Sequence, residues 1–289
     1  MTLVLKTIAA ARQWVHAEHS SGRTIGLVPT MGYLHEGHLS LIRRAKQRCD
    51  RTVVSLFVNP LQFGPGEDYD RYPREFSRDL ALLEGEQTDA VFHPDAGEMY
   101  PAPPVISVSA GKMGERLCGE SRPGHFNGVA TVVAKLFHIL EPHLAFFGQK
   151  DAQQIAILRA MIRELNFPLG LEVCPTVREP DGLAMSSRNV YLNAQERQHA
   201  TVLYRSLENA RGLIASGTRD AASVERKMRE MIEAEPGTNL DYARVVDTNS
   251  LEPIGEIRGE VLVAVAVRFG KTRLIDNMLL APGGTGTRH

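Results

Sequence analysis

The sequence predicts an α/β fold: a Rossmann-like parallel sheet domain with helices on both faces, followed by a smaller C-terminal α+β domain. Short β-rich runs alternate with segments of helical period through the first 175 residues. Those runs are apolar at successive positions, which is typical of strands buried on both faces of a parallel sheet. After about residue 177 the order changes to helical segments and then strands, which indicates a separate α+β domain.

The elements of the first domain follow in order along the chain. Residues 24–29 (TIGLVP) predict a buried strand, and residues 38–49 predict the helix after it. Residues 51–60 predict the next strand, an almost continuous apolar run that ends in Asn-Pro. The other expected elements are a helix over 75–86, strands over 89–94 and 143–148, an amphipathic helix over 151–166 and a strand over 171–177.

The second domain begins after a turn-rich stretch at 176–189, where we expect a hinge. Residues 193–217 open with a capping box, Asn193 and Glu196, and predict one long helix. A second helix is predicted over 220–235, and strands follow over 240–248 and 260–269, with TRLIDNMLL at 272–280 after them. The expected division is therefore a Rossmann-like domain at 1–176, a small α+β domain at 177–282 and a flexible tail at 283–289.

Composition excludes several classes of partner. The 33 basic and 34 acidic side chains nearly cancel, so no basic field indicates nucleic acid or a membrane surface. Residues 1–19 lack the apolar core and cleavage site of a signal peptide, and no apolar run reaches membrane-spanning length, so we expect a cytoplasmic protein. Cys49, Cys118 and Cys174 form no C-x-x-C pair, which favours reduced thiols over a disulfide framework or zinc site.

The stretch PTMGYLHEGH (29–38) stands where a strand turns into a helix. Glycine is costly in a helix, so Gly32 and Gly37 indicate close approach of backbone and ligand. Ligands of open parallel sheets bind where strands end and helices begin, and a helix N-terminus suits phosphate. We expect His35 and His38 on one helix face, where each ring nitrogen can donate to a phosphate oxygen. The alternative is two surface histidines at a helix start.

Other nucleotide and metal motifs do not fit. The zinc-protease signature needs histidines four apart, whereas His35 and His38 are three apart. GKT at 270–272 has Val265 where a Walker A loop needs its first glycine, so we expect a hairpin turn there. No strand-coupled G-x-G-x-x-G occurs. A bound nucleotide would therefore use the histidine motif.

Three further stretches carry candidate chemistry. FGQKDAQQ (147–154) follows a predicted strand, with Lys150 in the turn, Asp151 placed to cap the helix and Gln154 able to hydrogen-bond a small polar substrate. Here the plainer alternative is a cap and a solvated lysine. NPLQFGPGEDYDRYP (59–73) has Gln62 at a strand end, followed by a loop long enough to act as a lid. AMSSRN (184–189) places two hydroxyls and an arginine at the expected hinge, where they could clamp a triphosphate or form an ordinary loop.

In their order and spacing, PTMGYLHEGH, FVNPLQF, FGQKD and MSSRN resemble the pantoate–β-alanine ligase family, over about residues 1 to 280. HEGH is similar to the His-x-Gly-His signature of nucleotidylyltransferases. The resemblance implies an ATP-dependent (AMP-forming) ligase of pantothenate and coenzyme A biosynthesis. (R)-Pantoate and ATP would give pantoyl adenylate and pyrophosphate, and β-alanine would then give pantothenate and AMP. A nucleotidylyltransferase of the same superfamily is the alternative enzyme, and a nucleotide-binding module without catalysis is the alternative from another class.

The resemblance also implies roles for the domains and for individual residues. Residues 1–176 would bind nucleotide and pantoate, and residues 177–282 would form a lid or clamp. His38 would be a proton donor, His35 a phosphate contact and Lys150 the cation on the phosphates. Many members carry glutamate where this chain has Gln149, so that side chain is not expected to be essential. Gln62 would bind pantoate and β-alanine, and Gln154 pantoate.

The full set of implied site residues is larger. The implied catalytic residues are His35, His38, Lys150, Ser186, Ser187 and Arg188. The implied ATP-binding residues are Met31, Gly32, Tyr33, Leu34, His35, Glu36, Gly37, His38, Gly148, Gln149, Lys150, Asp151, Val177, Met185, Ser186, Ser187 and Arg188. The resemblance further implies Mg²⁺ with ATP, through ligands that the sequence does not indicate, and a cytosolic homodimer.

Overall fold

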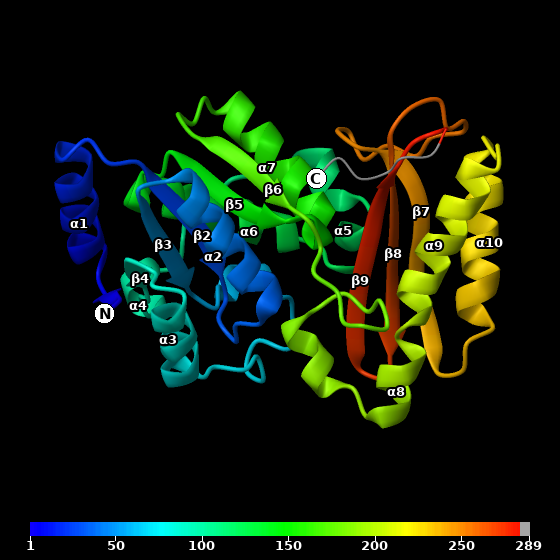
Figure 1. The fold of residues 1–289 in the computed structure, drawn as a ribbon, viewed down its shortest axis with the longest axis horizontal. Coiled ribbons are helices and arrows are strands. Elements are labelled where there is room, and N and C mark those ends of the chain that lie inside the picture. The colour runs from blue at the N-terminus through cyan, green and yellow to red at the C-terminus, as the bar shows by residue number, and fades with distance from the viewer. Residues whose placement is uncertain (284–289) are drawn as a thin grey trace. The chain divides into compact units, whose positions relative to one another are not determined.

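The computed structural model describes residues 1–283, so the predicted flexible tail at 283–289 lies outside the described residues except for Gly283. These residues divide into two compact units, coloured along the chain in Figure 1. The first unit comprises Met1–Glu115, Arg122–Gly148 and Ile157–Cys174. The second comprises Arg116–Ser121, Gln149–Ala156 and the chain from Pro175 onward. The predicted domain boundary between residues 176 and 177 stays a prediction.

Within residues 1–283, six parallel strands form the sheet of the first unit, in the order β1-β4-β3-β2-β5-β6. The chain steps outward from β2 to β3 and β4 and then returns to β5 on the other side of β2. The strand order therefore reverses between β2 and β5, which pair through Gly26 with Leu144 and Leu27 with Ala145. The strands are β1 (Leu3–Leu5), β2 (Ile25–Thr30), β3 (Arg51–Leu56), β4 (Ala90–Phe92), β5 (Leu144–Gly148) and β6 (Gly170–Cys174).

Helices cover this sheet. Helices α2 (Glu36–Arg48) and α3 (Phe76–Gly85) pack on one face, where Ile42 and Leu83 join the buried strand residues Val28 and Val54. Right-handed crossovers place α1 (Ile8–Ser20) and α6 (His125–Leu140), which contact each other, on the opposite face. The shorter elements are α4 (Ala96–Met99), α5 (Cys118–Ser121), η1 (Pro60–Gln62) and η2 (Gly111–Glu115), and η3 (Gln149–Asp151) leads into α7 (Ala152–Glu164).

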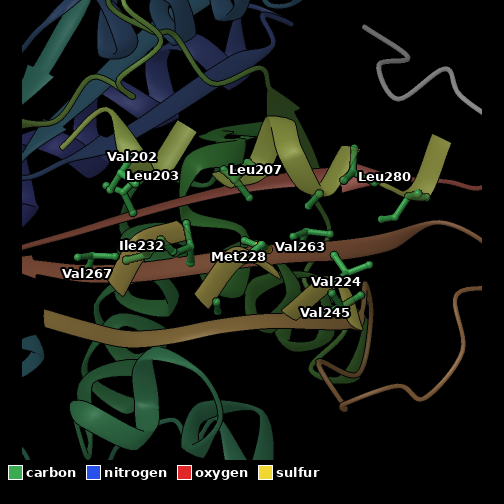
Figure 2. Close-up of a cluster of buried hydrophobic side chains, with 14 of the residues drawn as sticks. Val202, Leu203, Leu207, Val224, Met228, Ile232, Val245, Val263, Val267 and Leu280 are labelled. Carbon is green, nitrogen blue, oxygen red and sulfur yellow. The ribbon is translucent and has the colours of Figure 1, made fainter. Parts of the chain in front are cut away.

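The second unit is a three-stranded antiparallel sheet, in the order β7-β8-β9, covered on one face by two helices in the described part of the chain. Figure 2 shows Leu207, Met228 and Val263 meeting in the apolar layer between the helices and the sheet. The predicted turn at 270–272 is the β8–β9 hairpin, with Gly270 in the left-handed region at φ 55°. The elements are η4 (Ser187–Tyr191), α8 (Ala194–His199), α9 (Val202–Ala215), α10 (Ala221–Glu233), β7 (Thr238–Asp247), β8 (Val261–Phe269) and β9 (Thr272–Leu280).

The predicted fold class is confirmed: a parallel sheet with helices, and a smaller unit of helices and antiparallel strands. The predicted helix over 193–217 is wrong in one respect, because it is two helices, α8 and α9. Its capping box of Asn193 and Glu196 is present. The helix breaks where the Thr201 hydroxyl donates to the carbonyl of Gln198 (2.8 Å), a local bond that competes with helix continuation.

Two predicted strands are shorter than expected: the strand predicted over 171–177 is β6, which ends at Cys174. The strand predicted over 51–60 ends at Leu56, because Asn59 already caps the short helix η1 with its side chain. Helices α1 and α6 were not predicted. Among the described helices, none is both long and apolar enough to span a bilayer.

Candidate active site

The carboxyl ends of β2 and β5 are the starting points of two predicted nucleotide-binding segments. PTMGYLHEGH runs out of β2, and Gly148, the first residue of GQKD, ends β5. Because β2 and β5 are neighbouring parallel strands at the point where the strand order reverses, both segments begin at the switch point of the sheet. This is the usual ligand position in an open parallel sheet.

The loop between β2 and α2 is held by a buried carboxylate on α3. Asp79, which is 2% exposed, accepts the N–H of Tyr33 (2.7 Å) and of Leu34 (2.8 Å). Gly32 (φ +85°) and Tyr33 (φ 52°) both lie in the left-handed region, and a Cβ at Gly32 would come within 3.0 Å of the Asp79 carboxylate. Burial raises the pKa of Asp79, whereas the two N–H donors and Arg78 lower it. No pattern in the sequence singled out Asp79.

The two histidines form the cap of α2. The prediction that both lie on one helix face needs adjustment, because His35 is the N-cap, with extended backbone, and only His38 is helical. Nδ1 of His35 accepts the Gly37 N–H (3.1 Å), and Nδ1 of His38 accepts the His35 N–H (3.3 Å). Because Nδ1 is an acceptor in both rings, each neutral imidazole carries its hydrogen on Nε2. Gly37 is needed here, since a Cβ would lie 2.9 Å from the His35 ring.

The amide of Gln62 is oriented by the end of β3 and by α6. Asn59 Nδ2 donates to Gln62 Oε1 (3.1 Å) and to the carbonyl of Gly128 (3.1 Å). The Tyr100 hydroxyl donates to Asn59 Oδ1 (3.0 Å), which fixes the amide of this buried residue. Gln62 Nε2 lies 3.0 Å from Met31 Sδ. The structure therefore brings together two residues that the sequence placed in one site.

The backbone of Gln62 is fixed by two residues that sequence reasoning missed. His125 Nδ1 donates to the Gln62 carbonyl (2.7 Å), and Arg122 Nη2 donates to the same oxygen (3.3 Å). Arg122 also forms a two-pronged ion pair with Glu67 (2.7 and 2.6 Å). Its Nη1 lies 2.9 Å from His125 Nε2. These contacts anchor the root of the predicted lid loop.

Two neighbouring glutamines at the start of α7, Gln153 and Gln154, lie in different environments. Gln154, the predicted pantoate ligand, is half-buried in the first turn. Gln153 is buried, accepts the Cys118 N–H (3.0 Å) and donates to the carbonyl of Arg116 (2.6 Å). Lys150 Nζ lies 3.8 Å from the carboxylate of Asp151. Asp151 is the last residue of η3 and directly precedes α7, so its expected capping role stays a prediction.

The segment 177–188 is a closed loop in the second unit. The Met185 N–H donates to the carbonyl of Val177 (3.0 Å), so the predicted adenine contact and the predicted clamp lie together. Ser186 caps η4 by accepting the Arg188 N–H (3.2 Å), and Ser187 is buried. The Ser186 hydroxyl therefore also serves the local fold.

The predicted site residues are divided between the units. Residues 31–38, Gln62 and Gly148 belong to the first unit, and residues 149–154, 177 and 185–188 belong to the second. Within residues 1–283, no group of three or more histidine, cysteine, aspartate or glutamate side chains could hold a metal ion. All three cysteines are free thiols in this described chain, as expected.

A parallel sheet whose switch point carries a histidine-capped helix defines a nucleotide-binding α/β protein. Comparison with known proteins narrows this class. The sequence profile described as Pantoate-beta-alanine ligase matches residues 3–279. Pantothenate synthetases from Caldicellulosiruptor bescii and Pelotomaculum thermopropionicum are 52% and 54% identical over 278 residues, covering 96% of this chain and 99% of each relative. The chain belongs to the pantoate-beta-alanine ligase family.

Solved structures of the same family are similar to this chain in fold. The crystal structure of pantothenate synthetase from Thermus thermophilus is 45% identical with a TM-score of 0.92, covering 97% of this chain and 100% of that one. A pantoate-beta-alanine ligase from Francisella tularensis, complexed with beta-gamma ATP and beta-alanine, is 31% identical with a TM-score of 0.79. That comparison covers 96% of this chain and 98% of the Francisella chain.

Proposed function

We propose that this ligase makes pantothenate from (R)-pantoate and β-alanine, through a pantoyl adenylate. Pantothenate synthesis follows from its family and from relatives more than half identical over nearly the full chain. The Francisella relative with bound ATP analogue and β-alanine supports ATP and the amine as substrates. Mg²⁺ would enter with ATP, because it usually binds through phosphate oxygens and water.

In the first step, a pantoate carboxylate oxygen attacks the α-phosphorus of ATP. The bond to the β-phosphate breaks, and pyrophosphate leaves with its electrons. This step needs mainly positioning and charge stabilisation from the protein. His35 and His38 would donate Nε2–H bonds to phosphate oxygens, and Lys150 would add a positive charge. Ser186, Ser187 and Arg188 would clamp the triphosphate, for which the planar, always-charged guanidinium of Arg188 is suited.

In the second step, the neutral amine of β-alanine attacks the acyl carbon of the adenylate. The amide forms, AMP leaves with the electrons of the carbon–oxygen bond, and the amine loses a proton. Gln62 and Gln154 would hold pantoate by hydrogen bonds to its hydroxyl or carboxylate groups. A closed lid would protect the adenylate from water.

The proposal extends to assembly and location: a homodimer in the cytoplasm. The homodimer rests on the resemblance to the ligase family. Light scattering tests the assembly state. A mass of one chain at micromolar concentration would contradict the homodimer.

The observation that carries the proposed chemistry is the start of α2, which His35 and His38 cap directly after the switch-point strand β2. The test is mass detection of pantothenate from pantoate, β-alanine and Mg-ATP. AMP should form only when both pantoate and β-alanine are present. A nucleotidylyltransferase would instead release a dinucleotide-like product, and a binding module would show no pantoate-dependent exchange of labelled pyrophosphate into ATP.

A further inference from the structure

The backbone of the Lys150 turn is held by a side chain from the last strand. Asn277 on β9, which is 4% exposed, donates from Nδ2 to the carbonyls of Gln149 (3.0 Å) and Lys150 (2.8 Å). Its Oδ1 accepts from Gln149 Nε2 (3.0 Å). Asn277 therefore contacts the carbonyl of Lys150 and both the carbonyl and the side-chain amide of Gln149. The conformation of the turn therefore depends on a residue 127 positions later in the chain.

The neighbouring residue on β9 holds the other nucleotide-binding segment of the second unit. Asp276 is buried and receives a two-pronged ion pair from Arg178 (2.6 and 3.0 Å). Arg178 directly follows Val177 and also donates to the carbonyl of Gly182 (3.0 Å). Its guanidinium stacks 4.6 Å from the centre of the Tyr204 ring. Asp276 thus fixes the loop that carries the predicted adenine contact.

Strand geometry explains how two adjacent residues reach two segments. Side chains alternate between the two faces of a strand. Asp276 shares its face with Leu274 and Leu280, which pack in the core beneath the helices, and Asn277 lies on the opposite face. The Asn277 N–H also donates to Asp276 Oδ1 (2.8 Å), so the orientation of each side chain supports the other.

We propose that Asp276 and Asn277 form a brace that positions the Lys150 turn and the 177–188 loop relative to each other. The effect of this brace on ATP binding presupposes the proposed function. Neither residue touches substrate in this proposal; both act through the segments that they hold. Burial raises the pKa of Asp276, and the hydrogen bonds and charge of Arg178, together with the charge of Lys150, act in the opposite direction.

The test compares Asn277→Ala and the equal-sized Asn277→Asp with Leu274→Val as matched control. Leu274 is buried on the same strand and belongs to the apolar core, so its variant reports general weakening of β9. Loss of the two Nδ2 donors should raise the KM for ATP roughly tenfold in pyrophosphate exchange, while the KM for pantoate changes less than about twofold. Leu274→Val should change the KM for ATP less than about twofold, even if its melting temperature falls as much as that of the Asn277 variants. If Asn277→Ala does not fold, Asn277→Asp keeps the volume and loses the same donors.

A second measurement needs no substrate. Amides 149–152 should exchange hydrogen faster in both Asn277 variants than in the wild-type protein and in Leu274→Val. Unchanged exchange there, or a rise in the KM for ATP equal to that of the control, would overturn the brace. A wild-type protein without pantoate-dependent pyrophosphate exchange would overturn the proposed function instead, and the exchange of amides 149–152 would still decide the brace.

Discussion

His35 and His38 each serve the fold through Nδ1, and the proposed chemistry uses Nε2. Both Nδ1 atoms cap α2, and both hydrogens are therefore on Nε2. In the proposed function, the same two side chains therefore serve both stability and catalysis. Substitutions that remove the rings must affect both properties, and the two effects can be separated by the choice of replacement.

We expect His35→Ala and His38→Ala each to slow adenylate formation by about 10²–10³. Each should also lose about 1 kcal/mol of unfolding free energy, because the N-cap or its reciprocal bond is lost. His35→Asn keeps an oxygen that can accept the Gly37 N–H but removes the Nε2–H donor. It should regain the stability in urea unfolding and remain slow in pyrophosphate exchange. Recovery of both properties in His35→Asn would show that His35 is only a cap.

The neighbours Gln153 and Gln154 offer a matched pair. Gln154→Ala should raise the KM for pantoate about tenfold or more with a smaller effect on ATP, because a site built for a polar group discriminates strongly. Gln153→Ala should instead lower the unfolding free energy by about 1–3 kcal/mol, since it leaves the buried Cys118 N–H without its acceptor and removes one of the two donors to the Arg116 carbonyl. Steady-state kinetics and urea unfolding measure the two effects. Unchanged pantoate kinetics in Gln154→Ala would remove it from the site.

At the scale of elements, α6 approaches η1 so closely that only glycine fits. A Cβ at Gly128 would lie 2.1 Å from the carbonyl oxygen of Leu61 and 2.7 Å from the backbone nitrogen of Gln62. Gly128→Ala must therefore displace the Gln62 turn, and we expect a loss of about 1–3 kcal/mol and a raised KM for pantoate. Gly212→Ala in α9 is the control, because its Cβ meets nothing within 4 Å. That variant should be neutral or up to about 1 kcal/mol more stable; equal outcomes for the two would contradict the close packing.

The ion pair between Glu67 and Arg122, which holds the loop after Gln62, should contribute stability that depends on pH. Burial raises the pKa of Glu67, but the hydrogen bonds and charge of Arg122 outweigh it, and the pKa lies below its ordinary value of 4.5. The folded state then holds this proton less tightly than the unfolded chain, so the ion pair stabilises the fold above pH 4.5. That stabilisation, about 1 kcal/mol, should be lost as the pH falls below 4.5. Urea unfolding against pH should show a smaller acid loss in Glu67→Gln than in the wild-type protein; parallel curves would contradict this.

The elements that the sequence predicted are those whose pattern is local. Apolar runs such as 24–29 and the amphipathic helix at 220–235 carry their own period, and both are present. Helix α6 was missed because it is apolar around most of its circumference and rich in valine, so its period does not distinguish helix from strand. At the break between α8 and α9 the Thr201 hydroxyl bonds the Gln198 carbonyl, and no apolar period marks this position.

The residues of the candidate site also differ in whether the sequence could predict them. Motifs identified the residues expected to meet substrate, because those residues stand together in the sequence. The residues that hold them stand far away: Asp79 is 46 positions from Tyr33, and His125 is 63 positions from Gln62. Contacts at that separation follow from the packing of α3 and α6 and leave no local pattern. Supporting residues of this kind need the fold before they can be recognised.

At the scale of the whole molecule, the predicted ATP-binding residues are divided between two units, which gives the last prediction. The proposed lid at 62–72 belongs to the first unit and the proposed MSSR clamp to the second, so ligand binding should order a segment in each unit. With a non-hydrolysable ATP analogue and pantoate, hydrogen-exchange protection should rise together across 184–189 and across the loop at 62–72. Either ligand alone should give less protection than both. The loop at 248–252, outside the predicted site, is the control and should not change. If the amides of 184–189 keep their exchange rates when both ligands bind, MSSR is a fixed part of the second unit and not a clamp.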